Sequence, residues 1–204
     1  MQEQKQMIDG LDMSVVEQIA EHYKSILTLI GEDPERDGLK KTPMRAAKAL
    51  SFLTSGYRKE PKKVVNSAIF EYSGSKMVIV KGIEFYSLCE HHILPFYGEI
   101  SIGYVPGEGM VGLSKVARIV DVFARRLQVQ ERLTREVCDV LYKELGAKGV
   151  IVYCEADHMC MKMRGVEKEN SSTVTIEYCG VFDDAAMRQE FFSLLQGYKK
   201  CYAQ

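Results

Sequence analysis

The 204-residue chain lacks a sizeable net charge, a long apolar run and a leader-like N-terminus. Its 27 Lys and Arg against 28 Asp and Glu give a formal net charge of −1, so no overall field draws it toward nucleic acid or a membrane surface. No apolar stretch is long enough to span a bilayer, and residues 1–13 are polar, without the apolar core of a signal peptide. These absences predict a cytoplasmic protein with no nucleic-acid partner and no membrane partner, in which a local basic cluster holds any anionic ligand.

Six cysteines are present, and nothing in the sequence predicts that they form disulfides. Without a secretory signal the expected compartment is the reducing cytoplasm, where cysteines serve as metal ligands, nucleophiles or core residues. Cys138, Cys154 and Cys179 lie in strongly apolar helix-like or strand-like segments and are predicted to fill the core. Two of the others, Cys89 and Cys160, stand beside histidines, which makes them candidates for chemistry.

The first third of the chain carries two helical patterns. Ser14 and Glu17 form a capping box that opens a helix ending at Gly31. Thr42 and a following proline start a second helix that reaches about residue 53. A poorly patterned connector follows over 59–75. We expect an N-terminal helical region, 1–58, before a larger catalytic domain, 59–204.

The larger domain shows strands and helices in an order typical of an α+β fold. Ser114 and Asp183 are predicted to cap helices, and residues 94–98 to form a turn. The expected elements are two strands, two helices, two strands and a final helix, near 78–85, 100–104, 114–124, 131–145, 150–154, 174–178 and from 183. This order favours an antiparallel sheet with packed helices over a doubly wound parallel sheet.

Three of the four histidines lie within two short stretches that also contain cysteine. One stretch is Cys89-Glu90-His91-His92, and the other is His158-Met159-Cys160. Thiolate and imidazole are the ligands that zinc prefers. Cys89 and His92 are three residues apart, so one turn of chain can present both to one ion, and Cys160 completes a set of three. If the second stretch is extended, His158 and Cys160 point to one face, which Lys162 and Arg164 continue.

Three interpretations of these residues remain open. In a catalytic site, zinc takes Cys89, His92 and Cys160, and water fills the fourth position. In a structural site His158 fills that position instead, and in the third interpretation the residues are buried without metal. The catalytic interpretation is favoured, because this chain is too large to need zinc for folding. It leaves His91 and His158 as imidazoles suited to proton transfer near neutral pH.

Basic pairs at helical spacing are candidates for binding a polyphosphate. Lys115 and Arg118 share one helix face near Ser114, at a helix N-terminus that itself favours anions. Arg45 and Lys48 repeat the arrangement, and Arg164 follows Cys160 by four residues. Such pairs are more often solvated faces, but their conjunction with the metal stretch favours a phosphate ligand.

Gln130 and Glu131 begin the fourth predicted helix. The carboxylate of Glu131 is suited to complement the helix dipole. It is equally suited to accept two parallel hydrogen bonds from a guanine ring, whose N1–H and exocyclic amine form a matching pair of donors. Spacing alone does not choose between these interpretations.

Together these segments resemble GTP cyclohydrolase I over roughly residues 38–195. The resemblance is carried by six motifs: Ser87-Leu88-Cys89-Glu90-His91-His92; Gly112-Leu113-Ser114-Lys115 with Arg118; Gln128-Val129-Gln130-Glu131-Arg132-Leu133-Thr134; His158-Met159-Cys160-Met161 with Arg164-Gly165; Thr173-x-Thr175; and Thr42-Pro43-x-Arg45. The resemblance implies a tunnelling fold (T-fold), an α+β domain whose sheets associate into a barrel. It also implies a homodecamer of two pentamers with active sites between subunits.

The resemblance further implies a zinc-dependent conversion of GTP and water to 7,8-dihydroneopterin 3'-triphosphate and formate, the first step of pterin and folate synthesis. In that family's pattern the zinc ligands are Cys89, His92 and Cys160, and the proton carriers are His158, His91 and Ser114. Glu131 and Gln130 hold the guanine. The triphosphate is bound by Arg164, Lys115, Arg118, Arg45 and Lys48.

Two rival functions belong to other classes. One is a ring-forming binding module with structural zinc, which would lose its fold with the metal. The other is a different tunnelling-fold enzyme, such as the nitrile reductase of queuosine synthesis. That reaction needs a cysteine nucleophile and NADPH, which the set of two cysteines and three histidines fits poorly.

Overall fold

The computed structural model describes residues 7–66, 69–71, 76–107 and 109–199. The chain divides into two compact units, Met1–Arg58 and Lys59–Gln204, and each is described by itself. Among the described residues, no helix is both long and apolar enough to cross a membrane.

The first unit is a pair of helices preceded by a two-stranded hairpin. α1 begins two residues earlier than the capping box predicts, because Asp12 and not Ser14 is the N-cap: its carboxylate accepts a hydrogen bond from the Ser14 backbone N–H at 3.0 Å. Gly31, with φ +91°, follows the end of α1 as predicted. The elements are β1 (Met7–Ile8), β2 (Leu11–Asp12), α1 (Met13–Leu29), α2 (Thr42–Leu53) and the 3-10 helix η1 (Ser55–Arg58). Buried residues of α1 and α2 form the core of this unit.

The second unit is built on a five-stranded sheet in the order β7-β4-β5-β8-β9. All neighbouring strands are antiparallel except β4 and β7, which are parallel. The strands are β4 (Val78–Cys89), β5 (Pro95–Val105), β7 (Leu127–Gln128), β8 (Gly149–His158) and β9 (Thr173–Gly180). This arrangement confirms the predicted α+β class with an antiparallel-dominated sheet.

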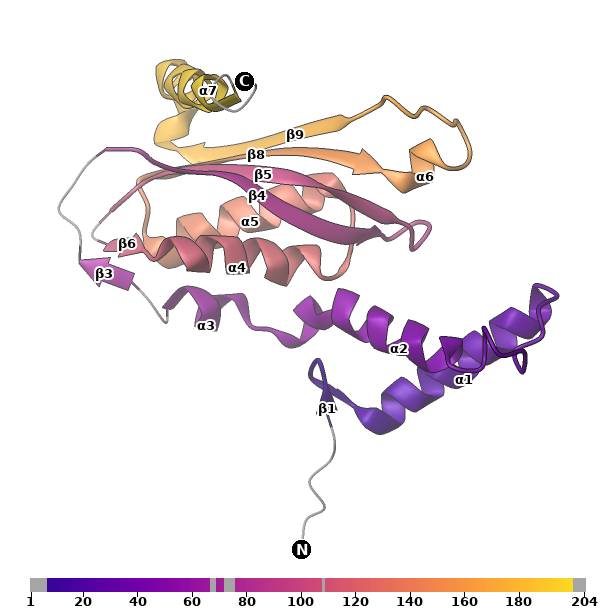
Figure 1. Ribbon diagram of the computed structural model, residues 1–204. Helices are drawn as coiled ribbons and strands as arrows, with labels where there is room; N and C mark the ends of the chain where they lie inside the picture. The colour runs from indigo at the N-terminus through magenta and orange to yellow at the C-terminus, as the bar shows by residue number, and fades with distance from the viewer. Residues whose placement is uncertain (1–6, 67–68, 72–75, 108, 200–204) are drawn as a thin grey trace, which may run out of the picture. The chain divides into compact units, whose positions relative to one another are not determined.

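Helices cover both faces of this sheet (Figure 1). α4 (Leu113–Ala124) and α5 (Gln130–Leu145) pack on one face through the main core, which includes Phe85, Ile100 and Val152. The opposite face carries α7 (Ala185–Lys199), whose Phe191 packs on Ile151 in a separate core cluster. α5 ends at Gly146, with φ +56°, as the sequence predicts.

Several predicted boundaries in this unit are wrong. The connector at 59–75 contains α3 (Pro61–Asn66) and β3 (Ile69–Glu71), which pairs with β6 (Gly109–Val111) across 38 to 42 residues of sequence and so leaves no local signature. Gly112 caps α4 in place of Ser114. Asp184, after the 3-10 helix η2 (Val181–Asp183), accepts from the Ala186 backbone N–H in place of Asp183.

Candidate active site

The turn between β4 and β5, residues 89–94, presents two of the predicted metal ligands and is called the ligand loop. Its backbone closes on itself, because Cys89 N donates to Leu94 O at 2.8 Å and Ile93 N donates to Cys89 O at 2.8 Å. Ile93 has φ +55°, in the left-handed region that β-branched residues rarely adopt. The ligand loop is therefore a constrained turn that fixes the directions of Cys89 and His92. The prediction of a turn at 94–98 is wrong, since β5 already begins at Pro95.

The end of β8 brings the third predicted ligand to the ligand loop. Phe96 of β5 pairs with His158 of β8, and the short helix α6 (Met159–Lys162) begins directly afterwards. The stretch is extended only as far as His158, because Met159–Lys162 is helical, and Lys162 pairs with Asp157 at 2.9 Å instead of continuing one face with Cys160. Figure 1 shows α6 at the same end of the sheet as the turn between β4 and β5.

Cys89, His92 and Cys160 offer ligand atoms that all lie within 4.8 Å of one another. Cys89 Sγ is 3.9 Å from His92 Nδ1. A tetrahedral zinc ion with bonds of about 2.0–2.3 Å places its ligand atoms about 3.3–3.8 Å apart, so a small contraction accommodates the ion. Cys89 is buried, His92 is exposed and Cys160 is intermediate. These three residues therefore fit a metal by donor type and spacing, with one side of the group toward solvent.

His91 lies beside this group and outside it. Its Nδ1 is also 3.9 Å from Cys89 Sγ, but its side chain is 64% exposed, and its Nε2 lies 3.9 Å from Glu90 Oε1. The imidazole is thus close to the predicted metal position and accessible to a ligand.

The thiol of Cys160 is electrostatically linked to two neighbours. Burial first, and then the adjacent Cys89 thiol, raise the pKa of Cys160, while the charge of Arg164 opposes this increase. A thiol with a raised pKa stays protonated at neutral pH, so metal binding at this group must release protons. Arg164 therefore lies near enough to Cys160 for its charge to favour the thiolate form.

His158 is held by neighbouring protein groups and is not one of the three clustered ligands. Its ring stacks on Phe96, with centroids 4.8 Å apart and an interplanar angle of 4°, and its Nε2 is 2.8 Å from Gln130 Oε1. Gln130 Nε2 donates to the carbonyl oxygens of Cys154 at 3.2 Å and Thr173 at 2.9 Å. Because carbonyls only accept, they assign the amide's orientation, and His158 Nε2 is therefore the donor to Gln130.

Burial lowers the pKa of His158, and the nearby carboxylates of Glu131 and Asp157 oppose this effect. The ring is consequently neutral at pH 7 in the absence of a ligand. Gln130 is 1% exposed, and its amide is already satisfied by protein groups. In this arrangement its side chain positions His158.

A hollow of about 220 Å³, the site pocket, adjoins the predicted metal group. Glu131 lies on its rim, exposed in the first turn of α5, so its carboxylate is accessible to a ligand in the pocket. The lining residues come from the ligand loop, the start of α5, the end of β8 and the start of β9: Cys89, His91, Gln128, Val129, Gln130, Glu131, His158, Cys160, Met161 and Thr173.

Within the second unit, three of the predicted ligands lie away from this pocket. Ser114, Lys115 and Arg118 lie in the first half of α4. The other end of α4 leads to β7, whose Gln128 pairs with Cys89. Twelve residues of helix span about 18 Å, so the helix start lies at the far end of the unit (Figure 1). Arg45 and Lys48 are exposed on α2 of the first unit.

Sequence reasoning missed the residues that support these groups. Phe96 was assigned to a turn, so its stacking on His158 was not foreseen. Thr175 Oγ1 lies 3.2 Å from Gln130 Nε2 and 2.6 Å from Thr134 Oγ1. These contacts join residues more than 40 positions apart, so sequence spacing does not predict them. The one indication in the sequence is that Thr134 and Thr175 both lie in motifs that resemble the family.

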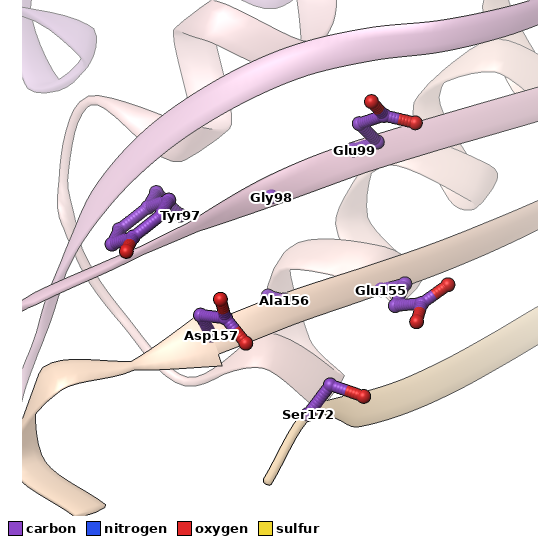
Figure 2. A pocket seen from close by; sticks show the side chains of 7 residues that line it. All are labelled: Tyr97, Gly98, Glu99, Glu155, Ala156, Asp157 and Ser172. Carbon is purple, nitrogen blue, oxygen red and sulfur yellow. The ribbon is translucent and has the colours of Figure 1, made fainter. Parts of the chain in front are cut away.

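A second hollow, of about 300 Å³, lies on β5 and β8, on the side of the sheet opposite to the His158 side chain, and is called the acidic hollow. Figure 2 shows Glu99 of β5 with Glu155 and Asp157 of β8 around it. Three carboxylates repel a triphosphate, and the cysteines and histidines of the ligand loop are not among its lining residues, Tyr97, Gly98, Glu99, Glu155, Ala156, Asp157 and Ser172. The acidic hollow is therefore not a site for the predicted chemistry.

The fold and the pocket define an α+β protein in which three residues that could hold a metal ion lie beside two further histidines. Residues 19–196 match the family model described as GTP cyclohydrolase I. The chain is 52% identical over 177 residues to GTP cyclohydrolase 1 of Porphyromonas gingivalis, covering 87% of this chain and 92% of that protein. It is 54% identical over 179 residues to the protein named GTP cyclohydrolase 1 2 of Pseudomonas aeruginosa, covering 87% and 99%.

A third relative, GTP cyclohydrolase 1 of Campylobacter lari, is 51% identical over 185 residues, covering 90% of this chain and 97% of that protein. The chain therefore belongs to the GTP cyclohydrolase I family of enzymes and has its tunnelling fold. The family resemblance predicted from the motifs is confirmed.

Proposed function

We propose that the chain is a zinc-dependent hydrolase that converts GTP and water to 7,8-dihydroneopterin 3'-triphosphate and formate. The observation that carries the proposal is the separation of roles among five soft ligands. Cys89, His92 and Cys160 converge within 4.8 Å, while His158 is held apart by Gln130. That separation distinguishes a three-ligand site open to water from a closed structural site.

Zinc would be held by Cys89, His92 and Cys160, and the chemistry that it supplies at such a site is activation of water near neutral pH. Glu131 accepts the N1–H and amine hydrogens of guanine at the mouth of the pocket. This contact brings the imidazole portion of the purine toward His158.

His158 supplies the proton that makes C8 electrophilic by protonating N7. Because Nε2 donates to Gln130, Nδ1 is the ring atom left to carry the transferable proton. The negative charge of GTP favours the charged imidazolium and offsets the burial that lowers the pKa of His158 in the free protein. Opening of the ring by two hydrolytic steps releases C8 as formate, and closure onto the rearranged ribose returns one water.

His91 and Ser114 are the proposed proton carriers for the ribose rearrangement. His91 is exposed beside the metal group. Ser114 is exposed in the first turn of α4 and reaches the site from a second copy of the chain.

We further propose that the active protein is a cytoplasmic homo-oligomer, a decamer of two pentamers, with sites between subunits. The placement of Ser114, Lys115 and Arg118 supports this, since α4 extends about 18 Å away from the ligand loop. A neighbouring copy would supply these residues to the triphosphate beside Arg164. Arg45 and Lys48 complete the proposed clamp, and the N-terminal region 1–58 precedes the catalytic domain.

The direct test is incubation of the zinc-loaded protein with GTP, with formate and pterin absorbance as readouts. We expect both products in equal amounts. A folded, zinc-loaded sample that yields neither would contradict the proposed activity.

Shared sites can be tested by mixing two impaired variants. Lys115→Gln and Glu131→Gln chains, each of low activity alone, should give higher activity when co-expressed, because mixed oligomers contain some sites with both native residues. Sites built within one chain would stay at the low activity of the single variants in every mixture, and that result would contradict the shared-site proposal.

A further inference from the structure

Arg132 joins the ligand loop to the start of α5. Its Nη2 donates to Glu90 Oε2, and its Nε donates to Gln128 Oε1 at 2.8 Å. Nη2 also lies 3.4 Å from Leu127 O. The planar guanidinium therefore connects the loop's own carboxylate to the strand β7 beside it, in the fixed fork geometry that lysine lacks.

Gln128 is held rigidly as the partner of Arg132. Its side chain is 1% exposed, and its Nε2 donates to Phe123 O at 3.2 Å and to Glu136 Oε2 at 2.7 Å. Both are acceptors, so the amide oxygen must face Arg132. The guanidinium is thus fixed from the side of the helical layer.

Glu90 is held through both its backbone and its side chain. Its backbone N–H donates to Gln128 O at 3.0 Å, beside the pairing of Cys89 with Gln128, and its carboxylate receives Arg132. The same loop contains Ile93 at φ +55°, a conformation that persists only when the surroundings impose it. Contacts that hold the loop therefore determine where Cys89 and His92 point.

We propose that Arg132 is a positioning residue that holds the ligand loop through Glu90 and keeps Cys89 and His92 in their metal-binding arrangement. The inference rests on the proposed metal site and extends it to residues that touch neither the metal nor the nucleotide. Removing partners of this kind in metal sites lowers metal affinity by about 10- to 100-fold.

The test compares Arg132→Gln with Arg135→Gln, a control at an exposed position on the same helix. Zinc dissociation constants are measured by competition with a chromophoric chelator, and thermal unfolding of the metal-free proteins checks folding. We expect about 10- to 100-fold weaker zinc binding for Arg132→Gln and wild-type affinity for Arg135→Gln. At limiting zinc, kcat should fall while KM for GTP stays near wild type, because Arg132 is not among the residues that line the site pocket.

A double-variant cycle with Glu90→Gln identifies the path of the effect. If Arg132 acts through Glu90, the double variant should bind zinc no more weakly than the weaker single variant. Arg132→Lys keeps the positive charge but lacks the forked guanidinium, so its zinc affinity should fall between those of wild type and Arg132→Gln. This variant still tests the inference if Arg132→Gln does not fold. Wild-type zinc affinity in Arg132→Gln, or fully additive losses in the cycle, would overturn the inference.

These outcomes are separable from the proposed function. A wild-type protein that binds zinc but does not turn over GTP would contradict the proposed reaction and still allow the zinc-affinity comparison to judge the role of Arg132.

Discussion

The site pocket and the acidic hollow use opposite sides of β8 near its end. His158 lines the pocket, and its neighbour Asp157 lines the hollow together with its strand partner Tyr97 of β5. Because successive side chains of a strand point to opposite faces, two contrasting environments arise from adjacent residues. The hollow is larger, at about 300 Å³ against about 220 Å³.

The comparison shows that chemistry and not volume identifies the site. The hollow gathers three carboxylates, which suits neither a triphosphate nor a soft metal. The smaller pocket is lined by two cysteines, two histidines and Glu131, and the positive charge of Arg164 favours the thiolate form of Cys160. Variants that change one face and spare the other can therefore test the assignment.

The largest effect is expected from Cys160→Ser. Loss of one ligand from the three-residue group should release zinc and remove a contribution of several kcal/mol to catalysis, or about a thousandfold in turnover. Zinc content by elemental analysis and formate release are the measurements. Cys179→Ser, which alters a half-buried thiol on β9, is the control and should keep both. Full activity in Cys160→Ser would show that the ligand assignment is wrong.

His158→Ala should separate proton transfer from metal binding. Removing a general acid lowers the rate by about 10²- to 10⁴-fold, while zinc content should stay at the wild-type level because His158 Nε2 is engaged with Gln130. The rate and the zinc content are measured on one sample. Loss of zinc along with activity would instead indicate a closed site with four protein ligands.

Glu131→Gln should weaken the use of GTP without loss of zinc. A hydrogen bond to a charged group contributes about 1.5–3 kcal/mol, so kcat/KM for GTP should fall by about 10- to 100-fold. Steady-state kinetics with GTP check this expectation. Unchanged kinetics would leave Glu131 with only a favourable interaction with the helix dipole.

The smallest effect is expected from the acidic hollow. Neutralising Glu99 and Glu155 together, as Glu99→Gln with Glu155→Gln, should leave kcat/KM for GTP and zinc content near wild type, because both line the acidic hollow (Figure 2) and neither lines the site pocket. Surface substitutions of this kind change stability by about 0.5 kcal/mol or less. A loss of turnover comparable to that of Glu131→Gln would remove the distinction between the two faces.

Much of the fold could be predicted because its signals are local. Helical spacing and a glycine stop delimit α5, and a proline in the first turn marks the start of α2. β3 could not be predicted, since its pairing with β6 depends on residues about 40 positions away. The cap of α1 was misplaced because Asp12 and Ser14 are both good capping residues and only the backbone geometry selects between them.

The candidate site also has parts that the sequence predicts and parts that it does not. Motif spacing predicts Cys89, His92 and Cys160 as metal ligands, and in the structure their ligand atoms lie close together. The sequence offered no means to see Gln130 holding His158 or Arg132 holding Glu90, because both contacts join separate elements across 28 and 42 residues. Residues that carry chemistry are recognisable by type, whereas residues that position them are recognisable only by contact.

In the proposed site, two cysteines and a single histidine bind the metal while His158 stays outside it. Zinc X-ray absorption spectroscopy of the loaded protein can distinguish this set of ligands from others. We expect two sulfur ligands and one imidazole around zinc, in the wild type and equally in His158→Ala. A second imidazole in the wild-type spectrum that disappears in His158→Ala would contradict it.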